Sequence, residues 1–215
     1  MEFKREQLEL YAITDRAWLG NETLAEQVEK ALKGGATMVQ LREKHLEREK
    51  FLEEAKEILP LCHRYQVPLI INDDVALAKE VGADGVHIGQ GDMALAAAKQ
   101  ILGEDAIIGV TAKTIDQARA AETAGATYLG SGAVFATNTK ADAKPMSLDL
   151  FQEICASVSI PVVAIGGISA TNLYSLKGRK MAGIAVVSGI FASADIEAET
   201  RRLRQKMDDI LEKGI

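Results

Sequence analysis

Short apolar runs recur at regular intervals along the chain, separated by longer stretches in which apolar and polar residues mix. The runs are rich in valine and isoleucine and show little polar alternation, a pattern typical of strands that are buried on both faces. Eight segments predict such strands: LYAIT (10–14), MVQLR (38–42), PLIIN (68–72), GVHIG (85–89), AIIGV (106–110), TYLGSG (127–132), PVVAIGG (161–167) and GIAVVSG (183–189).

The stretches between these runs carry apolar residues at helical spacing. After Asn21, a favourable N-cap residue, apolar side chains recur every four positions from Leu24 to Leu32. A glycine pair at 34–35 predicts the end of that helix. The same reasoning predicts helices over 49–65, 74–81, 93–102, 114–124 and 147–158, and a long amphipathic helix over 195–211.

The junction from helix to strand has one recurring form, seen in GGATMV, VGADGV and AGATYL. Such repetition indicates one supersecondary unit that is used many times. Eight strands alternating with helices predict a parallel α/β sheet, and the count of eight favours a closed (β/α)8 TIM barrel in a single domain over residues 1–215. A doubly wound open sheet is the alternative, but its GxGxxG fingerprint should follow the first strand, where DRAWLGNE stands instead.

Composition narrows the functional classes. The 215 residues are 47% hydrophobic and carry a net charge of -6 at pH 7, which argues against general binding to the nucleic-acid backbone. No apolar run approaches the roughly 20 residues of a membrane-spanning helix, and the N-terminal MEFKREQLEL lacks the apolar centre of a signal peptide. Cys62 and Cys155 show no CxxC spacing, so we expect two reduced, partly buried thiols in a cytoplasmic protein.

Charged residues follow the second predicted strand, at the end where active sites of such barrels gather. In QLREK, alternation places Gln40, Arg42 and Lys44 on one side of the strand. Leu41 and Glu43 fall on the other side. Two cations on one face suit a phosphate or diphosphate, and a solvated strand end that continues into HLEREK is an equally weighted alternative.

Two further strand ends carry carboxylates, Asp73 in INDD and Asp92 in GQGD. Because the third and fourth strands are neighbours in the barrel, we expect both carboxylates on one part of the rim, where they suit Mg2+ held together with substrate phosphates. Two alternatives stay open. Both residues could be helix N-caps, since Asp92 directly precedes a helix predicted to begin at Met93, or they could form a general acid–base pair.

Three loops on the same rim suggest anion binding. AIGGIS (164–169) and VVSGI (186–190) end the seventh and eighth strands, where backbone N–H groups of this fold often bind phosphate, although each could also be a simple tight turn. The stretch YLGSGAVFATNTKADAKP (128–145) opens from a strand into hydroxyl and amide side chains followed by Lys140. It is interpreted either as a solvated loop or as an anion-binding loop.

Two features stay outside this scheme. His87 lies within the fourth strand without a partner at metal-ligand spacing, so we expect a hydrogen-bonded core histidine rather than a ligand. The segment SLKGRKMAG (175–183) is unusually basic, and the sequence offers no explanation for it.

Together, the segments QLREK, IINDD, GADGVHIGQGD, GVTAKT, YLGSGAVFATNTK, VVAIGGI and GIAVVSGIF resemble the thiamine-phosphate synthase (thiamine-phosphate pyrophosphorylase) family in order and spacing, from about Tyr11 to Ile196. The resemblance implies a single-barrel transferase of thiamine biosynthesis. Such an enzyme joins a hydroxymethylpyrimidine diphosphate to a thiazole phosphate and releases thiamine phosphate and diphosphate. It implies Mg2+ as the cofactor and two small-molecule substrates, with no nucleic-acid or membrane partner. The oligomeric state stays open, with a homo-oligomer as one option.

The resemblance also implies residue roles, which we state as expectations. The pyrimidine diphosphate would be bound by Gln40, Leu41, Arg42, Glu43, Lys44, Asn72, Thr111 and Lys140. The thiazole phosphate would be bound by Thr137, Asn138, Thr139, Gly167, Val187 and Ser188. Mg2+ would be ligated by Asp73 and Asp92. Charge on the leaving diphosphate would be neutralised by the catalytic residues Arg42, Lys44 and Lys140.

The sequence departs from the family pattern at Thr111, Ala133, Asp74 and Gly189, where Ser, Pro, Arg and Ala are common, and no departure removes an implied ligand. Three rival functions stay open. A thiazole tautomerase on the same barrel would need a histidine after the sixth strand. A phosphosugar epimerase or aldolase would need histidine metal ligands or a Schiff-base lysine, and a non-enzymatic module would bind ligands without turnover.

Overall fold

A closed barrel of eight parallel strands forms the centre of the computed structural model, which describes residues 2–137 and 145–212. The strands follow one another around the barrel in chain order, and β8 closes it against β1. The strands are β1 (Leu10–Ile13), β2 (Met38–Leu41), β3 (Leu69–Asn72), β4 (Gly85–Ile88), β5 (Ile107–Thr111), β6 (Tyr128–Gly132), β7 (Val162–Ile165) and β8 (Gly183–Val186). The predicted (β/α)8 barrel is therefore confirmed.

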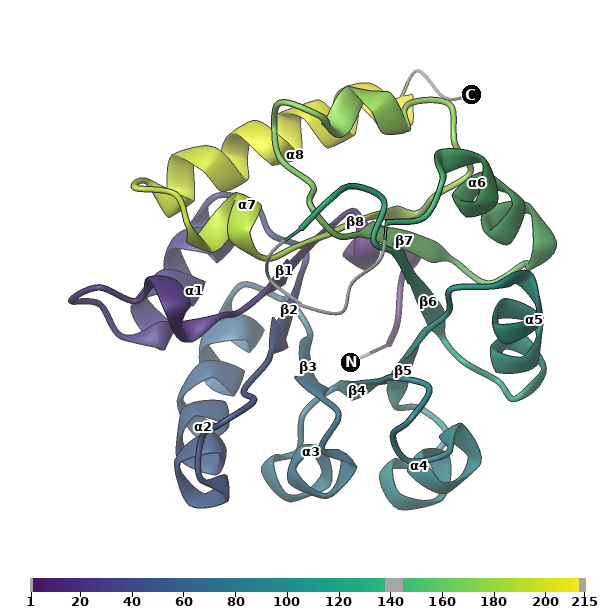
Figure 1. Ribbon diagram of the computed structural model, residues 1–215. Coiled ribbons are helices and arrows are strands. Elements are labelled where there is room, and N and C mark those ends of the chain that lie inside the picture. The colour runs from purple at the N-terminus through teal and green to yellow at the C-terminus, as the bar shows by residue number, and fades with distance from the viewer. Residues whose placement is uncertain (1, 138–144, 213–215) are drawn as a thin grey trace.

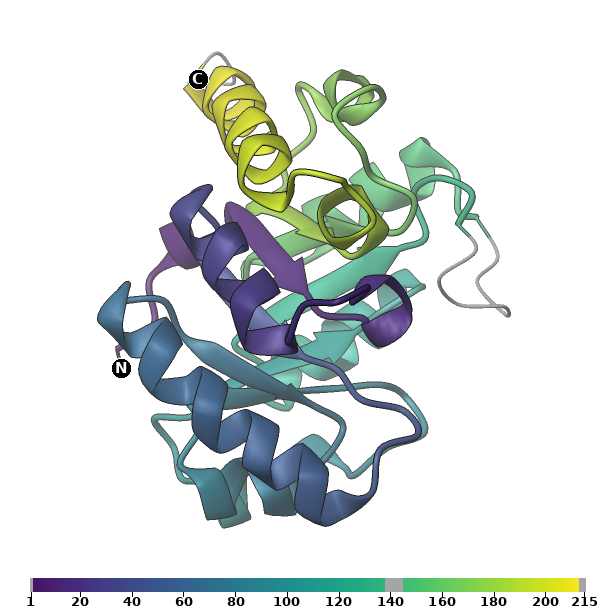
Figure 2. The ribbon, with the colours of Figure 1, turned by 90° about the vertical axis from the view of Figure 1, so that its left-hand side faces the viewer.

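Helices surround the strands on the outside (Figure 1). They are α1 (Leu24–Lys33), α2 (Arg48–Arg64), α3 (Val75–Val81), α4 (Leu95–Leu102), α5 (Ile115–Thr123), α6 (Leu148–Ser157), α7 (Ser188–Phe191) and α8 (Ile196–Glu212). Short 3-10 helices are η1 (Arg5–Leu8), η2 (Arg16–Trp18) and η3 (Leu173–Leu176). In Figure 2, α1, α2 and α8 lie beside one another along one flank of the barrel. None of the described helices is both long enough and apolar enough to span a bilayer.

The core has two layers, because alternate strand residues point to opposite faces. On β1, Tyr11 and Ile13 lie inside the barrel, whereas Leu10 and Ala12 belong to the larger cluster between the strands and the helices. Both layers are buried, so the strands are apolar without polar alternation. Leu8 of η1 joins the inner cluster and covers the amino-terminal end of the barrel.

Two predicted helix starts are wrong. The N-cap of α1 is Thr23, not Asn21, because the Thr23 side chain and the Glu26 side chain form a reciprocal capping box. The helix α4 begins at Leu95 with Ala94 at its N-cap, two residues later than predicted. Asp92 is therefore not a helix cap, and its Oδ2 instead accepts a hydrogen bond from the N–H of Gly89 at 2.6 Å.

Both cysteines are free and buried, as expected for structural thiols. Burial raises the pKa of Cys62 and of Cys155 to about 12, so neither is a reactive thiolate near neutral pH. The basic segment 175–183 receives a partial explanation. Arg179 donates a hydrogen bond from Nη1 to the carbonyl oxygen of Leu148 at 2.7 Å, which fastens this segment to the first turn of α6.

Candidate active site

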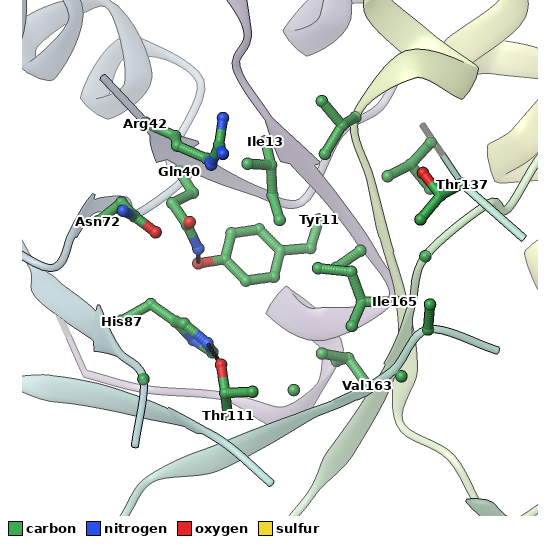
Figure 3. A pocket seen from close by; sticks show the side chains of 18 of the residues that line it. Tyr11, Ile13, Gln40, Arg42, Asn72, His87, Thr111, Thr137, Val163 and Ile165 are labelled. Atoms are coloured by element: carbon green, nitrogen blue, oxygen red, sulfur yellow. Dashed lines mark hydrogen bonds between the residues drawn. The ribbon is translucent and has the colours of Figure 1, made fainter. Parts of the chain in front are cut away.

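One pocket at the carboxyl ends of the strands collects most of the side chains that the sequence singles out (Figure 3). Its cavity volume is about 370 Å³, a size suited to a small-molecule ligand. Predicted site residues in its lining are Gln40, Arg42, Lys44, Asn72, Asp73, Asp92, Thr111, Thr137, Gly167, Val187 and Ser188. These residues come from seven different strand ends, which the closed barrel brings to one rim.

The side formed by β2 to β4 presents charged and amide side chains, and we call Arg42, Lys44, Asn72, Asp73 and Asp92 the charged wall. Lys44 Nζ lies 2.6 Å from Asp73 Oδ2. Arg42 Nη1 lies 3.6 Å from Asp15 Oδ2. Both cations line the pocket, so an incoming anion can compete with the carboxylates for them.

Leu41 and Glu43 face away from the pocket, as the strand alternation requires. Leu41 is fully buried between the barrel and the helices. Glu43 has a side chain only 3% exposed and pairs at 3.4 Å with Arg16, which also binds Glu54. Burial, together with repulsion from Glu54, raises the pKa of Glu43 to about 7 despite the Arg16 guanidinium. These contacts are behind the charged wall, not inside the cavity.

Asn72 is the residue of the charged wall with an unsatisfied hydrogen-bond donor. Its Nδ2 atom is buried and has no hydrogen-bond partner within the part of the chain that the structure describes. A buried unpaired donor costs free energy, on the order of 1–3 kcal/mol. Because Asn72 also lines the pocket, a ligand acceptor at this position would satisfy it.

The two carboxylates of the charged wall are not helix caps. Asp73 has a left-handed backbone conformation with φ 62°, and its N–H donates to the carbonyl of His87 at 2.9 Å. The cap of α3 is the next residue, Asp74, whose side chain accepts from Leu77 N–H. No group of three or more His, Cys, Asp or Glu side chains able to hold a metal occurs among the described residues. Asp73 and Asp92 thus offer hard oxygen donors that a phosphate-bearing ligand would have to supplement.

The opposite side of the pocket consists of small residues and backbone, and we call Gly132, Gly166, Gly167, Val187 and Ser188 the glycine wall. Gly167 has φ 64°, and a Cβ atom added there would lie 2.3 Å from the carbonyl oxygen of Ala136. Only glycine permits this close approach of the β6 and β7 loops. Asn172 holds the same turn through a 2.8 Å hydrogen bond from Nδ2 to the Gly167 carbonyl.

The loop after β6 is described up to Thr137, which lines the pocket beside the glycine wall. The other three residues predicted there, Asn138, Thr139 and Lys140, lie outside the described residues.

The floor of the pocket contains two residues that the sequence analysis missed or discounted. Tyr11 was missed because it lies in the middle of β1, although its i, i+2 relation to the inward-facing Ile13 predicts the same orientation. His87 is hydrogen-bonded through both ring nitrogens, as expected of a core histidine, yet its ring also lines the cavity. Burial lowers the pKa of His87 to about 4, so the ring is neutral near pH 7.

Comparisons with known proteins identify the family of the chain. The family model described as thiamine monophosphate synthase matches residues 10–190. The chain is 46% identical to the thiamine-phosphate synthase of Ruminiclostridium cellulolyticum, over 90% of this chain and 92% of that protein. It is 45% identical to the thiamine-phosphate synthase of Clostridium acetobutylicum, over 95% of each.

A solved structure supports the same assignment. The thiamine phosphate pyrophosphorylase of Pyrococcus furiosus superposes with a TM-score of 0.89 at 38% identity, and the match covers 96% of this chain and 98% of that one. The matched segments include all eight strands and therefore every strand end that lines the pocket. The chain belongs to the thiamine monophosphate synthase family, whose members are transferases.

Proposed function

We propose that the protein uses this pocket to transfer a hydroxymethylpyrimidine group from its diphosphate to the ring nitrogen of a thiazole phosphate. A carbon–nitrogen bond forms, the carbon–oxygen bond to the diphosphate breaks, and the electron pair of that bond leaves with the diphosphate. The observation that carries this proposal is the contrast between the two sides of one cavity. A side with two cations, two carboxylates and an unpaired amide donor suits a diphosphate bound together with a metal ion, and a backbone-lined side suits a second phosphate.

The charged wall is proposed to bind the pyrimidine diphosphate. Arg42 and Lys44 supply positive charge, and the unpaired Asn72 Nδ2 supplies a donor. Gln40 and Thr111 line the floor beside them and would bind the pyrimidine and the diphosphate. Leu41 and Glu43 would contribute through the backbone of the strand, since their side chains face the other way. Lys140, predicted from the sequence, would complete this set.

The glycine wall is proposed to bind the thiazole phosphate. Val187 and Ser188 stand at the start of the short helix α7, whose first N–H groups have no acceptor within the helix. Gly167 lets the neighbouring loop approach without a side chain in between. Thr137, with Asn138 and Thr139 from the sequence, would add hydroxyl and amide donors. This arrangement holds the thiazole close to the reacting carbon, which is a proximity effect.

Mg2+ is the proposed cofactor, and the residues present fit it. Asp73 and Asp92 line the cavity, and magnesium proteins commonly use one or two carboxylates together with substrate phosphates. When bound, Mg2+ would neutralise charge on the diphosphate. Lys44 then has a second task, because its 2.6 Å contact orients the Asp73 carboxylate.

The central step needs charge stabilisation rather than a general base. An electron-rich aminopyrimidine can stabilise a carbocation, so a dissociative route is chemically sensible. Arg42 and Lys44 would stabilise the negative charge that grows on the leaving diphosphate. The neutral His87 fits this scheme, because a histidine whose pKa lies near 4 is a poor proton acceptor at pH 7.

The test combines one assay with one variant. Purified protein, both substrates and Mg2+ should give thiamine phosphate and diphosphate in equal amounts, measured by liquid chromatography. Asp92→Asn keeps an oxygen that can accept from Gly89 N–H but removes the charge. We expect the Mg2+ concentration for half-maximal rate to rise at least about tenfold, the scale of one lost charge contact.

Asp105→Asn is the matched control, because Asp105 is exposed in a turn away from the pocket. An unchanged Mg2+ dependence in Asp92→Asn would remove Asp92 from the metal site. Absence of thiamine phosphate with the wild-type protein would overturn the proposed function itself.

A further inference from the structure

A continuous chain of hydrogen bonds crosses the interior of the barrel beneath the pocket. Gln40 Nε2 donates to Tyr11 Oη at 2.6 Å, and Tyr11 Oη lies 2.9 Å from Tyr128 Oη. His87 continues the chain, with Nδ1 3.1 Å from Tyr128 Oη and Nε2 3.0 Å from Thr111 Oγ1. The five residues come from β2, β1, β6, β4 and β5, so the chain joins distant strands.

Only the two ends and part of the middle reach the cavity. Figure 3 shows the Gln40–Tyr11 bond and the His87–Thr111 bond among the side chains that line the pocket. Tyr128, which joins them, is fully buried and is not part of the pocket lining. Its ring meets Tyr11 edge-on at 5.9 Å between centroids. A residue outside the pocket lining thus connects Tyr11 and His87, which both line the pocket.

Gly109 leaves the space that this chain of hydrogen bonds occupies inside the barrel. In the strand register, Gly109 is the partner of His87 on β4 and of Tyr128 on β6. A Cβ atom added to Gly109 would lie 2.1 Å from Tyr128 Cζ and 2.5 Å from His87 Nδ1. The absent side chain is therefore what allows the imidazole and the phenol to meet.

The direction of the hydrogen-bond network follows if each tyrosine gives its single hydroxyl hydrogen to a neighbour within the network. Gln40 Nε2 donates to Tyr11. On that premise Tyr11 donates across its contact with Tyr128, and Tyr128 donates across its contact with His87 Nδ1. A neutral imidazole that accepts at Nδ1 donates from Nε2, so Thr111 accepts from it. Burial raises the pKa of both tyrosines and lowers that of His87, which keeps all three groups neutral.

We propose that Tyr11, Tyr128 and His87 are positioning residues that fix the hydrogen-bond polarity of the pocket floor. With its Nε2 committed to Tyr11, Gln40 offers its amide oxygen to the ligand. With its oxygen accepting from His87, Thr111 directs its hydroxyl hydrogen into the pocket. The floor then accepts from an amino group at one end and donates to an anion at the other, as an aminopyrimidine carrying a diphosphate requires. The match to that substrate rests on the proposed function, whereas the polarity itself does not.

Nuclear magnetic resonance of the wild-type protein tests the polarity without any assay. The protein has three histidines, so 15N-histidine labelling gives few signals. The signal that disappears in His87→Gln is that of His87. Two-bond 1H–15N correlations at pH 7 should show the His87 ring protonated on Nε2 and not on Nδ1. A ring protonated on Nδ1 would overturn the proposal.

Tyr128→Phe tests the link between the two ends. The variant keeps the ring but removes the hydrogen that Tyr128 gives to His87 and the acceptor that it offers to Tyr11. We expect the Nε2-protonated fraction of His87 to fall and kcat/KM for the pyrimidine diphosphate to fall about tenfold, the effect of weakening a hydrogen bond to a charged group. Wild-type values of both quantities would contradict the proposal.

Two controls test whether a loss of activity comes from the changed hydrogen-bond direction or from a general disturbance of the structure. Tyr65→Phe removes a tyrosine hydroxyl that contacts Glu29 far from the floor, and it should leave kcat/KM unchanged. Thr111→Ser should retain activity and Thr111→Val should lose it, because only the first keeps a hydroxyl hydrogen. A Thr111→Val enzyme as active as Thr111→Ser would contradict the role given to that hydroxyl. A wild-type protein without synthase activity would overturn the proposed function, and the His87 spectrum would still decide the polarity.

Discussion

The charged wall and the glycine wall face one another across a single cavity, yet they are built in different ways. The charged wall uses long side chains whose partners are other side chains, such as Lys44 with Asp73. The glycine wall uses backbone that is brought close because side chains are missing, as at Gly167. Substitutions in the charged wall should therefore act on substrate binding through charge, and substitutions in the glycine wall through shape.

Removing a positive charge from the charged wall should have the largest effect on kcat/KM. We expect Arg42→Ala to lower kcat/KM at least about a hundredfold, the scale of losing one donor to a developing anion. The melting temperature should change little, because the Arg42–Asp15 contact of 3.6 Å is partly exposed and contributes little to stability. Steady-state kinetics with both substrates measure the effect.

Arg64→Ala is the matched control for this variant, since Arg64 is 69% exposed and its only described ion pair is with Glu29. It should retain wild-type kinetics. Equal losses in Arg42→Ala and Arg64→Ala would mean that net charge, and not the wall, governs the reaction.

Adding a methyl group to the glycine wall should have an intermediate effect, on KM for the thiazole phosphate. In Gly167→Ala the new Cβ would meet Ala136 O and Phe135, so the segment leading to Thr137 must move. We expect KM for the thiazole phosphate to rise about tenfold, the cost of disturbing contacts of roughly 1 kcal/mol or more. KM for the pyrimidine diphosphate should stay within a factor of two.

Gly178→Ala separates the clash from backbone strain. Gly178 also has a positive φ, 81°, but nothing lies within 4 Å of its missing Cβ. Both variants should lose stability through strain, at about 1–2 kcal/mol per residue. If Gly178→Ala raised the same KM as strongly, the close approach at Gly167 would not explain the effect.

The smallest expected effect concerns the support behind the charged wall. The pKa of Glu43 is about 7 in the folded protein and near its ordinary value of 4.5 in the unfolded chain. Between these values the folded state holds a proton that the unfolded state has released, so the Glu43 contribution to stability falls as pH rises. Glu43→Gln cannot ionise, and its melting temperature relative to wild type should be higher by a few degrees at pH 8 than at pH 5.

Glu57→Gln, an exposed change on the same helix as Glu54, controls for net charge. Differential scanning fluorimetry across this pH range measures both variants. A pH-independent difference between Glu43→Gln and wild type would show that Glu43 is ionised throughout.

The sequence was sufficient for the fold, because the barrel depends on local patterns. Val- and Ile-rich runs predicted all eight strands, since strands buried on both faces are apolar throughout. The start of a helix was harder to predict where two nearby residues could each serve as its N-cap. Asn21 and Thr23 are both good N-caps, and only Thr23 has a glutamate three residues later.

The site was predictable only in part, and the two walls again differ. Alternation in QLREK correctly separated the pocket-facing Gln40, Arg42 and Lys44 from Leu41 and Glu43. The chain of hydrogen bonds through Tyr11, Tyr128 and His87 could not be predicted, because its members are far apart in sequence and meet only in the closed barrel. The clash geometry at Gly167 likewise depends on a second loop.

The most direct test of the two-wall account is a crossed binding measurement by isothermal titration calorimetry. Each substrate is titrated into wild-type protein, Arg42→Ala and Gly167→Ala in the presence of Mg2+. The account predicts that Arg42→Ala weakens the pyrimidine diphosphate at least about tenfold and leaves the thiazole phosphate within a factor of two, and that Gly167→Ala does the reverse. If both variants weakened both ligands equally, the division of the pocket into two walls would be wrong.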